Sequence, residues 1–413
     1  MSGTPPAVLG ALKHRNFTLY LVARFIATLA VQMQSVAVGW QVYAITNDPL
    51  DLGLLGLAQF LPFVVLVLPA GQIADRYDRK FILATCYVVE VVCAALLLGF
   101  TMYGLSTAWP VFMVLVLFGA ARAFAMPTSQ AITPNLVPRE IFGNAVALNS
   151  STFHVATIVG PSLGGLMYVA GPSSVYAVVT VLLIVSVAFM LSVRMPATIR
   201  STEPASWHTV LEGLRFVRSR PVVLGAISLD LFAVLFGGAT AMLPVFAKDI
   251  LATGPEGLGL LRTAPAIGAA ATAALLAVFP ITRSVGRWMF AGVALFGVAI
   301  VVFGLSNSFA LSLAALVSLG AGDMVSVYIR HILIQLETPD EIRGRVSAVN
   351  AVFIGASNEL GEFESGVTAA WFGLVPSVIL GGAATIAITG LWMRLFPTLR
   401  TMDRFPGADK PAS

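Results

Sequence analysis

The sequence has few charged residues and only two cysteines, and both features limit the classes of protein to which the chain can belong. Only 11% of its 413 residues are Asp, Glu, Lys or Arg, whereas 58% are hydrophobic. A soluble domain typically carries about 25% charged residues, so the composition excludes that class and indicates a chain that crosses a membrane many times. The two cysteines, Cys86 and Cys93, cannot build a disulfide framework or a metal cluster, and we interpret them as packing residues.

Signatures of nucleotide and metal chemistry are also absent from the sequence. No segment matches G-x-x-x-x-G-K-[ST], and no polar region is long enough for an ATPase domain. His, Cys and acidic residues are never spaced as in a metal site, and no nucleophile and base occur at paired positions. We therefore expect no cofactor, no metal and no enzymatic activity. The net charge of +4 is interpreted as a topology signal, not as a nucleic-acid surface.

Apolar segments long enough to cross a bilayer, about 20 residues each, recur along the whole chain. They predict an all-α membrane protein with twelve transmembrane helices. An even number of spans places both termini on one side, and the Lys and Arg bias makes that side the cytoplasm, leaving only Lys248 and Arg262 opposite. The predicted spans are 17–45, 52–74, 81–103, 108–132, 143–170, 174–195, 222–249, 258–281, 286–305, 309–336, 343–370 and 374–396.

The longest predicted internal connection, 196–221, divides the chain into two six-helix halves. Apolar side chains recur in it at near-helical spacing from Trp207 to Val217, which predicts an amphipathic helix at the membrane surface. The expected organisation is an N-terminal bundle at 1–195, this cytoplasmic linker, a C-terminal bundle at 222–397 and a cytoplasmic tail at 398–413.

The two halves repeat each other at an offset of 201 residues. This shift pairs Arg122 with Asp323 and Asn149 with Asn350, and it also aligns several glycines. Internal duplication of six-helix halves is a transporter architecture, with the substrate site expected near mid-membrane where the halves face each other.

A charged segment, Gly71–Lys80, separates the second and third predicted spans. It is similar to the loop between helices 2 and 3 of major facilitator superfamily transporters, which the chain resembles over essentially its whole length. Asp78 stands where that pattern usually has Gly. The resemblance implies a cytoplasmic gate that holds the ends of helices 2 and 11 together, formed by the matching residues Gly71, Asp75, Arg76, Arg79 and Lys80.

Two further resemblances concern export. Gly160, Pro161, Gly164 and Gly165 are similar to the end of the helix 5 motif of exporters that exchange substrate for protons. Two other segments, Glu212–Val217 and Ser357–Gly366, resemble the subgroup that contains enterobactin-type siderophore exporters and transmembrane secretion effectors.

Polar residues inside predicted spans are the candidates for the substrate cavity, because a charge there needs a partner or water. Arg24 shares one face of the first span with other polar residues. It either lines the cavity or pairs with a neighbouring helix, and the same alternatives hold for Arg122. The cavity candidates are Tyr20, Arg24, Thr28, Ser35, Arg122, Asn149 and Asn350.

Buried carboxylates near like charges exchange protons close to neutral pH, so intramembrane acids are candidates for proton coupling. Asp323 has a structural alternative, a local network with Arg330. The glutamates could instead be solvated near the outer helix end, and His154 could be a core histidine. The candidates, with Asp230 first, are Asp230, Glu359, Glu362, Asp323 and His154.

The sequence thus predicts a monomeric secondary transporter of the bacterial inner membrane. We expect it to export a small amphipathic molecule, such as a siderophore, drug or metabolite, in exchange for protons. Its partners would be that small molecule, protons and the lipid bilayer, with no nucleic acid. An importer or lipid flippase of the same fold remains an alternative, as does a non-transporting membrane sensor or assembly factor.

Overall fold

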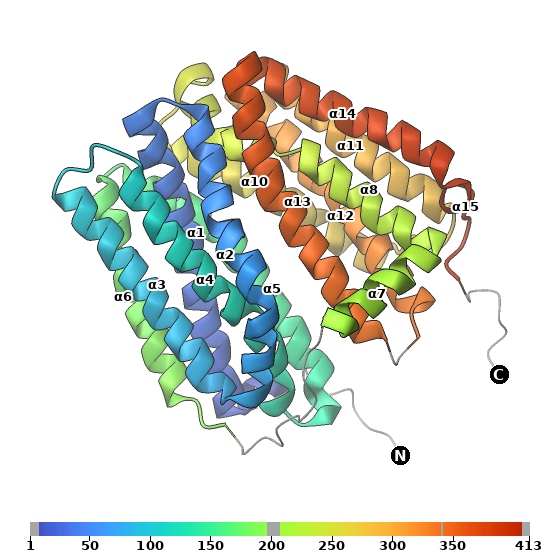
Figure 1. The fold of residues 1–413 in the computed structure, drawn as a ribbon, viewed down its shortest axis with the longest axis horizontal. Helices are drawn as coiled ribbons and strands as arrows, with labels where there is room; N and C mark the ends of the chain where they lie inside the picture. Colours follow the sequence, from blue (N-terminus) through green and yellow to red (C-terminus); the bar gives the residue numbers. More distant parts are fainter. Residues whose placement is uncertain (1–7, 196–206, 340–341, 407–413) are drawn as a thin grey trace. The chain divides into compact units, whose positions relative to one another are not determined.

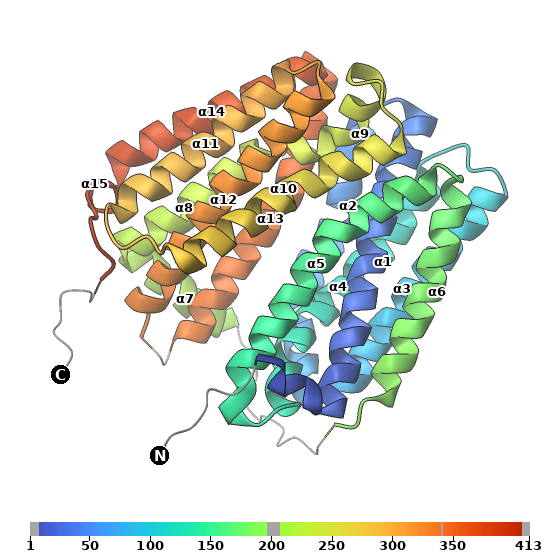
Figure 2. The same cartoon turned by 180° about the vertical axis from the view of Figure 1, so that it is seen from behind.

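The computed structural model describes residues 8–195, 207–339 and 342–406, which form helices joined by turns (Figures 1 and 2). The chain divides into two compact units. Unit 1 comprises Met1–Asn47, Ala58–Ala205 and Gly254–Gly259, and unit 2 comprises Asp48–Leu57, Ser206–Thr253 and Leu260–Ser413. The division at a central linker predicted from the sequence differs from these units in two short segments, 48–57 and 254–259, each of which packs with the opposite half of the chain.

Unit 1 is built around the first helix, α1, which packs against α5 and α6, while α3 packs against α4 and α6. α1 is long enough to cross a membrane and is followed after two residues by α2, whose later part belongs to this unit. The helices are α1 (Arg15–Thr46), α2 (Pro49–Arg76), α3 (Arg79–Met102), α4 (Trp109–Ile132), α5 (Phe142–Tyr168) and α6 (Pro172–Ser192), with short 3₁₀ turns η1 (Val8–Lys13), η2 (Thr133–Asn135) and η3 (Arg139–Ile141).

In unit 2, α11 packs against α12 and α14, and α8 packs against α13 and α14. Its core is apolar and includes Leu229, Met289, Phe290 and Leu333. The helices are α7 (Trp207–Ser219), α8 (Pro221–Phe236), η4 (Ala239–Met242), α9 (Leu243–Val245), the π-helical turn η5 (Phe246–Ile250), α10 (Pro255–Val278), α11 (Val285–Leu305), α12 (Phe309–Glu337), α13 (Arg343–Phe372), α14 (Leu374–Leu395) and α15 (Pro397–Arg400).

These elements confirm the predicted twelve-helix fold, with boundaries that shift by a few residues. Within the described residues, ten segments are long and apolar enough to span a membrane by length and composition. The other two predicted spans are α5 and α13, whose sequences are interrupted by polar residues such as Asn149 and Glu359. Helices of membrane transporters that carry polar groups usually turn them toward the bundle interior or a water-filled path, so α5 and α13 are the helices in which to look for a site.

The seventh span is not one continuous helix. α8 ends at Phe236, and Gly237 and Gly238 lead into the 3₁₀ turn η4, the single-turn α9 and the π-turn η5. Gly238 lies so close to α13 that an added Cβ would collide with the carbonyl oxygen of Gly361. Gly238 thus allows α13 to approach at the point where the helix is broken, and Gly237 gives room to Phe296 of α11; such breaks are common at transporter sites.

The internal repeat is visible in how its equivalent glycines pack. Gly119 on α4 and Gly320 on α12 are related by the 201-residue shift. A Cβ at Gly119 would collide with the backbone of Gln59 on α2, and a Cβ at Gly320 would collide with the backbone of Pro265 on α10. Glycine permits this close backbone approach between membrane helices, so the two units use the same helix contact at the same place.

α7 lies against the start of α13 in unit 2. Gly213 contacts the backbone of Arg345, and the carboxylate of Glu212 forms an ion pair with the guanidinium of the same residue. Leu214, Arg215 and Arg218 are exposed. α7 therefore covers the residues from Trp207 to Val217, where the sequence predicts an amphipathic helix. Residues 196–206 of the predicted linker lie outside the described part of the chain.

Candidate functional site

A polar cluster in unit 1 joins α1 to α5. The Tyr20 hydroxyl donates a hydrogen bond to the carbonyl oxygen of Ser129 at 2.9 Å, and it also interacts with Arg24, Asn149 and Thr133. Asn149 Oδ1 is buried and has no hydrogen-bond partner. Three of the predicted cavity residues, Tyr20, Arg24 and Asn149, are thus brought together by two helices.

Arg24 is half-buried and stacks its guanidinium over the ring of Phe153 on α5, with its Cζ atom 5.7 Å from the ring centroid. Such a cation–π contact orients the guanidinium while leaving N–H donors available for other groups. Further along the same helix, Thr28 is half-buried and Ser35 is exposed. Thr28 and Ser35 lie four and eleven residues after Arg24 on the same helix.

A second cation of unit 1, Arg122 on α4, has an exposed side chain whose Cζ lies 5.9 Å from the ring centroid of Phe63 on α2. It also interacts electrostatically with Glu90 on α3, a buried carboxylate whose Oε2 has no hydrogen-bond partner. Sequence reasoning missed Glu90. The signal was present, because Glu90 is the single acidic residue of an otherwise apolar span.

In unit 2, Asp230 on α8 forms a buried ion pair with Arg330 on α12; the two side chains are 7% and 3% exposed. Two buried charges of opposite sign largely offset each other's desolvation, whereas either charge alone would be costly. The sequence had offered Asp323 as a partner for Arg330 on the same helix, but the structure pairs Arg330 with Asp230. Asp323 is half-buried and lies three residues before Ser326 on α12; the buried Oγ of Ser326 lacks a hydrogen-bond partner.

The glutamates of α13 lie in a second polar region of unit 2. Glu362 contacts the first turns of α2, where a Cβ at Gly56 would lie 2.8 Å from its Oε2, and it interacts electrostatically with Arg262 on α10. Glu359 and Glu362 are both half-buried. Arg262, assigned from the sequence to the outer side of the membrane, thus lies within a helix and next to a carboxylate.

Two remaining candidates have contrasting surroundings. Asn350 on α13 is buried and its Oδ1 lacks a hydrogen-bond partner, as does that of its repeat equivalent Asn149. His154 is exposed, with its ring centroid 5.8 Å from that of Phe153.

The helix 5 motif makes close helix contacts within unit 1. Gly160 and Gly164 pack against α1, at Gln32 and Met33, and Gly165 packs against the first turn of α10 at Gly259. Pro161 is buried in the same surface, with its carbonyl oxygen near Gly259. These residues allow backbones to approach closely and contribute no charge.

The charged turn between α2 and α3 is capped by its own Asp78 and is also tied to α4. The Asp78 carboxylate accepts a hydrogen bond from the Lys80 amide at 2.9 Å and caps α3, while Arg79 donates one to the carbonyl oxygen of Ala131 on α4 at 2.9 Å. Asp78 thus fills a capping role where the family pattern has Gly. Gly71, Asp75 and Arg76 lie in the last two turns of α2; the side chain of Asp75 is outside the described part of the structure.

The equivalent turn of unit 2, between α10 and α11, is capped by an acidic residue of the C-terminal segment, Asp403. The Asp403 carboxylate accepts a hydrogen bond from the Ser284 amide at 3.0 Å and another from Arg283 Nε at 3.4 Å. These contacts, with the Ser284 hydrogen bond as the larger cause, hold the pKa of Asp403 below its ordinary value of 3.8. The turn therefore has a capping carboxylate although its own sequence has none.

A family model described as transmembrane secretion effector matches residues 7–409. The chain belongs to this family of major facilitator superfamily transporters. It is thus a multi-pass membrane protein that acts on small molecules, and its family and fold are those of transporters, not enzymes.

Relatives of this transporter family member are similar over almost their whole length. The enterobactin exporter EntS of Citrobacter koseri is 25% identical over 406 residues, which cover 95% of this chain and 94% of the exporter. EntS of Escherichia coli O139:H28 is 24% identical over 384 residues, covering 88% and 90% of the two chains.

Solved structures share the fold at lower identity. A bacterial homologue of the human lysosomal transporter Spinster, in an inward-facing and unoccupied conformation, has a TM-score of 0.74 at 14% identity, covering 98% of this chain and 100% of that one. The nucleoside transporter NupG has a TM-score of 0.70 at 13% identity, covering 92% and 99%. At these identities the likeness shows the fold alone.

Proposed function

We propose that this transporter exports a small amphipathic molecule in exchange for protons by alternating access. The observation that carries the proposal is the match to exporters of enterobactin along 94% of the Citrobacter koseri protein's length. Polar clusters on the intramembrane helices of both units support it, because a transporter needs polar groups for its substrate and for the coupling ion. A siderophore is the first substrate class to test.

The proposed substrate contact in unit 1 is the cluster of Tyr20, Arg24 and Asn149. Arg24 offers several N–H donors at a fixed position over Phe153, which suits an acidic or catechol-like oxygen of a substrate. The buried Oδ1 of Asn149 has no hydrogen-bond partner and would accept a hydrogen bond from a substrate hydroxyl. Thr28, Ser35, Arg122 and Asn350 remain further cavity candidates.

For the proton, we propose Asp230 as the first candidate. Its ion pair with Arg330 is buried, so protonation of the carboxylate would remove the partner charge of Arg330 and change how α8 and α12 interact. Glu359 and Glu362 are the second candidates, because Glu362 faces a cation, Arg262, in a contact of three helices. Asp323 and the exposed His154 follow.

The remaining parts of the proposal concern topology and gating. We infer a monomer of the bacterial inner membrane with both termini in the cytoplasm, from the Lys and Arg bias of the loops. Asp75 and its neighbouring basic residues would form the cytoplasmic gate. Replacing Asp75 with Asn would then shift the balance between inward-open and outward-open states without changing which substrates are carried, a shift measurable as altered accessibility of single cysteines on each side.

The test is transport by the purified chain in proteoliposomes with a pH gradient, using a labelled catecholate siderophore as the first substrate and labelled dyes as the next. We expect uptake into inside-acidic vesicles and its loss when the gradient is collapsed. Arg24→Gln should raise the KM by about tenfold, since loss of a hydrogen bond to a charged group costs 1.5–3 kcal/mol. Asp230→Asn, nearly equal in shape, should abolish gradient-driven transport in a folded protein.

Two results would contradict the proposal in different ways. Transport that persists unchanged after collapse of the pH gradient would remove proton coupling but leave export. Normal gradient-driven transport by a folded Asp230→Asn protein would remove that residue from the coupling mechanism, and Glu362→Gln would then be the next variant.

A further inference from the structure

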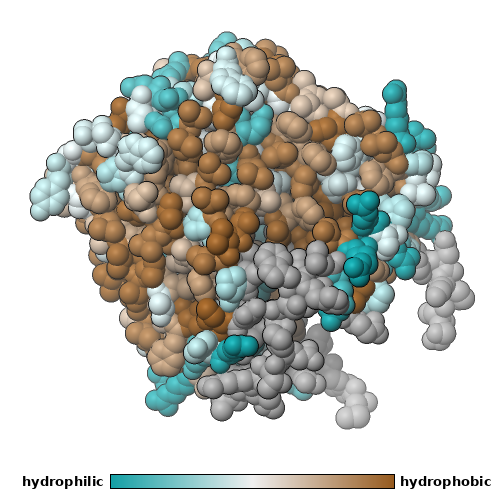
Figure 3. All heavy atoms as spheres, in the orientation of Figure 1, coloured by the Kyte–Doolittle hydropathy of each residue, from teal (hydrophilic) through white to brown (hydrophobic). Residues whose placement is uncertain are grey.

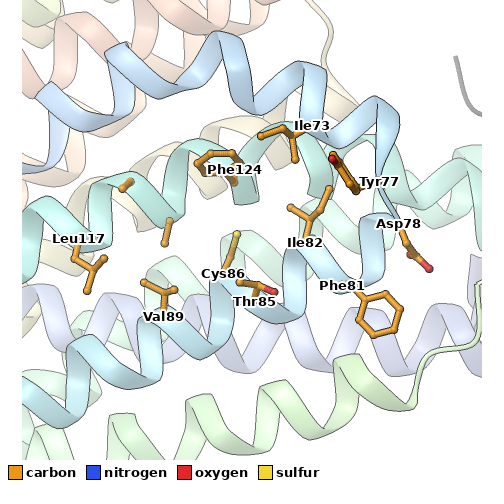
Figure 4. Close-up of a pocket in the computed structure, with 12 residues that line it drawn as sticks. Ile73, Tyr77, Asp78, Phe81, Ile82, Thr85, Cys86, Val89, Leu117 and Phe124 are labelled. Atoms are coloured by element: carbon orange, nitrogen blue, oxygen red, sulfur yellow. The ribbon is translucent and has the colours of Figure 1, made fainter. Parts of the chain in front are cut away.

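A groove of about 790 Å³ runs along the outer surface of unit 1, between the end of α2 and helices α3 and α4 (Figure 4). Its volume is in the range of ligand sites, roughly 300–1,000 Å³. Apart from Thr85 and the residues at its mouth, its walls are apolar, with Val89 and Leu117 at the end far from the α2–α3 turn. None of these residues belongs to the polar cluster around Arg24, so the groove is separate from the proposed substrate contact.

The groove opens on a face that carries large exposed apolar side chains. Leu117 is exposed on α4, and Val88 and Val92 are exposed on α3. Figure 3 shows that apolar residues dominate the visible surface of these helices. Since α3 and α4 are membrane-spanning segments, this face lies against lipid. The apolar walls of the groove therefore contact lipid hydrocarbon chains and not water.

The mouth of the groove has a different chemistry. Tyr77, Asp78 and Phe81 lie there, at the turn between α2 and α3. The Lys80 ammonium lies 5.6 Å from the centroid of the Phe81 ring and so stands over the mouth. Tyr77 is 66% exposed, and an exposed tyrosine at a helix end is typical of the interface between acyl chains and headgroups.

The acidic and basic groups at the mouth do not cancel. Asp78 is engaged by its own turn, since its carboxylate accepts the hydrogen bond of the Lys80 amide. Arg79 turns inward to the carbonyl oxygen of Ala131, whereas Arg76 is exposed. Residues 75–80 include three basic and two acidic residues, so the turn keeps a net charge of +1 where a lipid headgroup would lie, and this charge complements a phosphate.

We propose that the groove is a binding site for one anionic phospholipid from the leaflet on the side of the α2–α3 turn. One acyl chain lies between Ile82 and Phe124, and the phosphate is held near Lys80 with the Tyr77 hydroxyl beside it. The site selects a negatively charged headgroup over a zwitterionic one. This inference does not depend on the direction of transport or on proton coupling.

The experiment is native mass spectrometry of the full-length protein released from detergent micelles, titrated with phosphatidylglycerol or with phosphatidylcholine of identical acyl chains. We expect one tightly retained phosphatidylglycerol per chain and weaker retention of phosphatidylcholine. Lys80→Gln should weaken phosphatidylglycerol binding by about fivefold, the effect of one basic residue at a membrane surface. Asp78→Asn keeps a capping side chain and removes a negative charge, so it should strengthen binding.

A groove-filling variant, Thr85→Trp, should abolish retention of that one lipid. Val181→Trp, at an exposed position on α6 away from the groove, is its matched control and should bind as the wild type does. The proposal is overturned if Thr85→Trp retains the lipid, or if phosphatidylcholine binds as tightly as phosphatidylglycerol. Conversion of a dimer into a monomer by Thr85→Trp, with no change in lipid retention, would overturn it as well, in favour of a second copy of the chain as the occupant.

Discussion

Units 1 and 2 share helix order and equivalent packing glycines, but they treat intramembrane charge differently. In unit 1, Arg24 and Arg122 are half-buried or exposed and stack on phenylalanine rings. In unit 2, Asp230 and Arg330 are buried and bind each other. Arg24 on its ring face keeps N–H donors available to a ligand, and Arg122 also interacts with the buried Glu90. The buried pair of unit 2 is instead committed to the fold or to a change of protonation. The repeat has thus conserved backbone contacts while its two copies diverged in electrostatics.

The largest expected effect separates the two charge arrangements. Arg330→Ala leaves Asp230 buried without its partner, and breaking a buried pair costs about 3–5 kcal/mol. Arg24→Ala removes a half-exposed cation whose stacking contributes roughly 0.5–1 kcal/mol. Thermal unfolding of the purified proteins in detergent should therefore show a large loss for Arg330→Ala and little change for Arg24→Ala.

The double variant Asp230→Leu/Arg330→Met sharpens the same comparison. If the pair serves stability alone, an apolar replacement restores the fold and leaves transport intact; if it serves coupling, the fold returns and transport does not. Similar losses of stability for Arg24→Ala and Arg330→Ala would show that the two units do not differ in this way.

A smaller effect tests what the units have in common. Gly119→Ala and Gly320→Ala each force a Cβ into the backbone of the neighbouring helix, and overpacking of this kind costs typically 1–3 kcal/mol. We expect both variants to lower the unfolding temperature by similar amounts. Gly99→Ala on α3 and Gly390→Ala on α14 are matched controls, because no atom lies within 4 Å of an added Cβ. If only one of the two variants lowered the unfolding temperature, the two glycine contacts would not be equivalent.

The smallest effect concerns the two turns. Asp403→Ala removes the carboxylate that caps the α10–α11 turn, so the Ser284 amide should exchange its hydrogen faster, while the α2–α3 turn is unaffected. Because the pKa of Asp403 is lower in the folded protein, the carboxylate stabilises the turn above the unfolded value of 3.8 and loses this effect as pH falls through the folded value. The exchange ratio of variant to wild type should approach one at acid pH; a constant ratio would contradict this role.

The sequence was sufficient for the fold because hydrophobic length, loop charge and an internal repeat are local signals. The sequence also predicted Tyr20, Arg24 and Asn149 as cavity residues, because helical spacing and the internal repeat both select polar positions within spans. The pairing of Asp230 with Arg330 could not be predicted, because it depends on how α8 and α12 pack. The same holds for Asp403, whose partner lies 119 residues earlier in the chain.

That distance has a consequence for how the chain is made. In the turn of unit 1 the capping Asp78 is close in sequence to the amide that it binds, whereas the turn of unit 2 is capped only when Asp403 has been synthesised. Domains fold as units during synthesis, the N-terminal one first. The turn between α10 and α11 therefore stays uncapped until Asp403 has been synthesised. For anyone expressing this protein, a truncation before residue 403 removes a structural part of the second bundle, and an affinity tag is better placed beyond it.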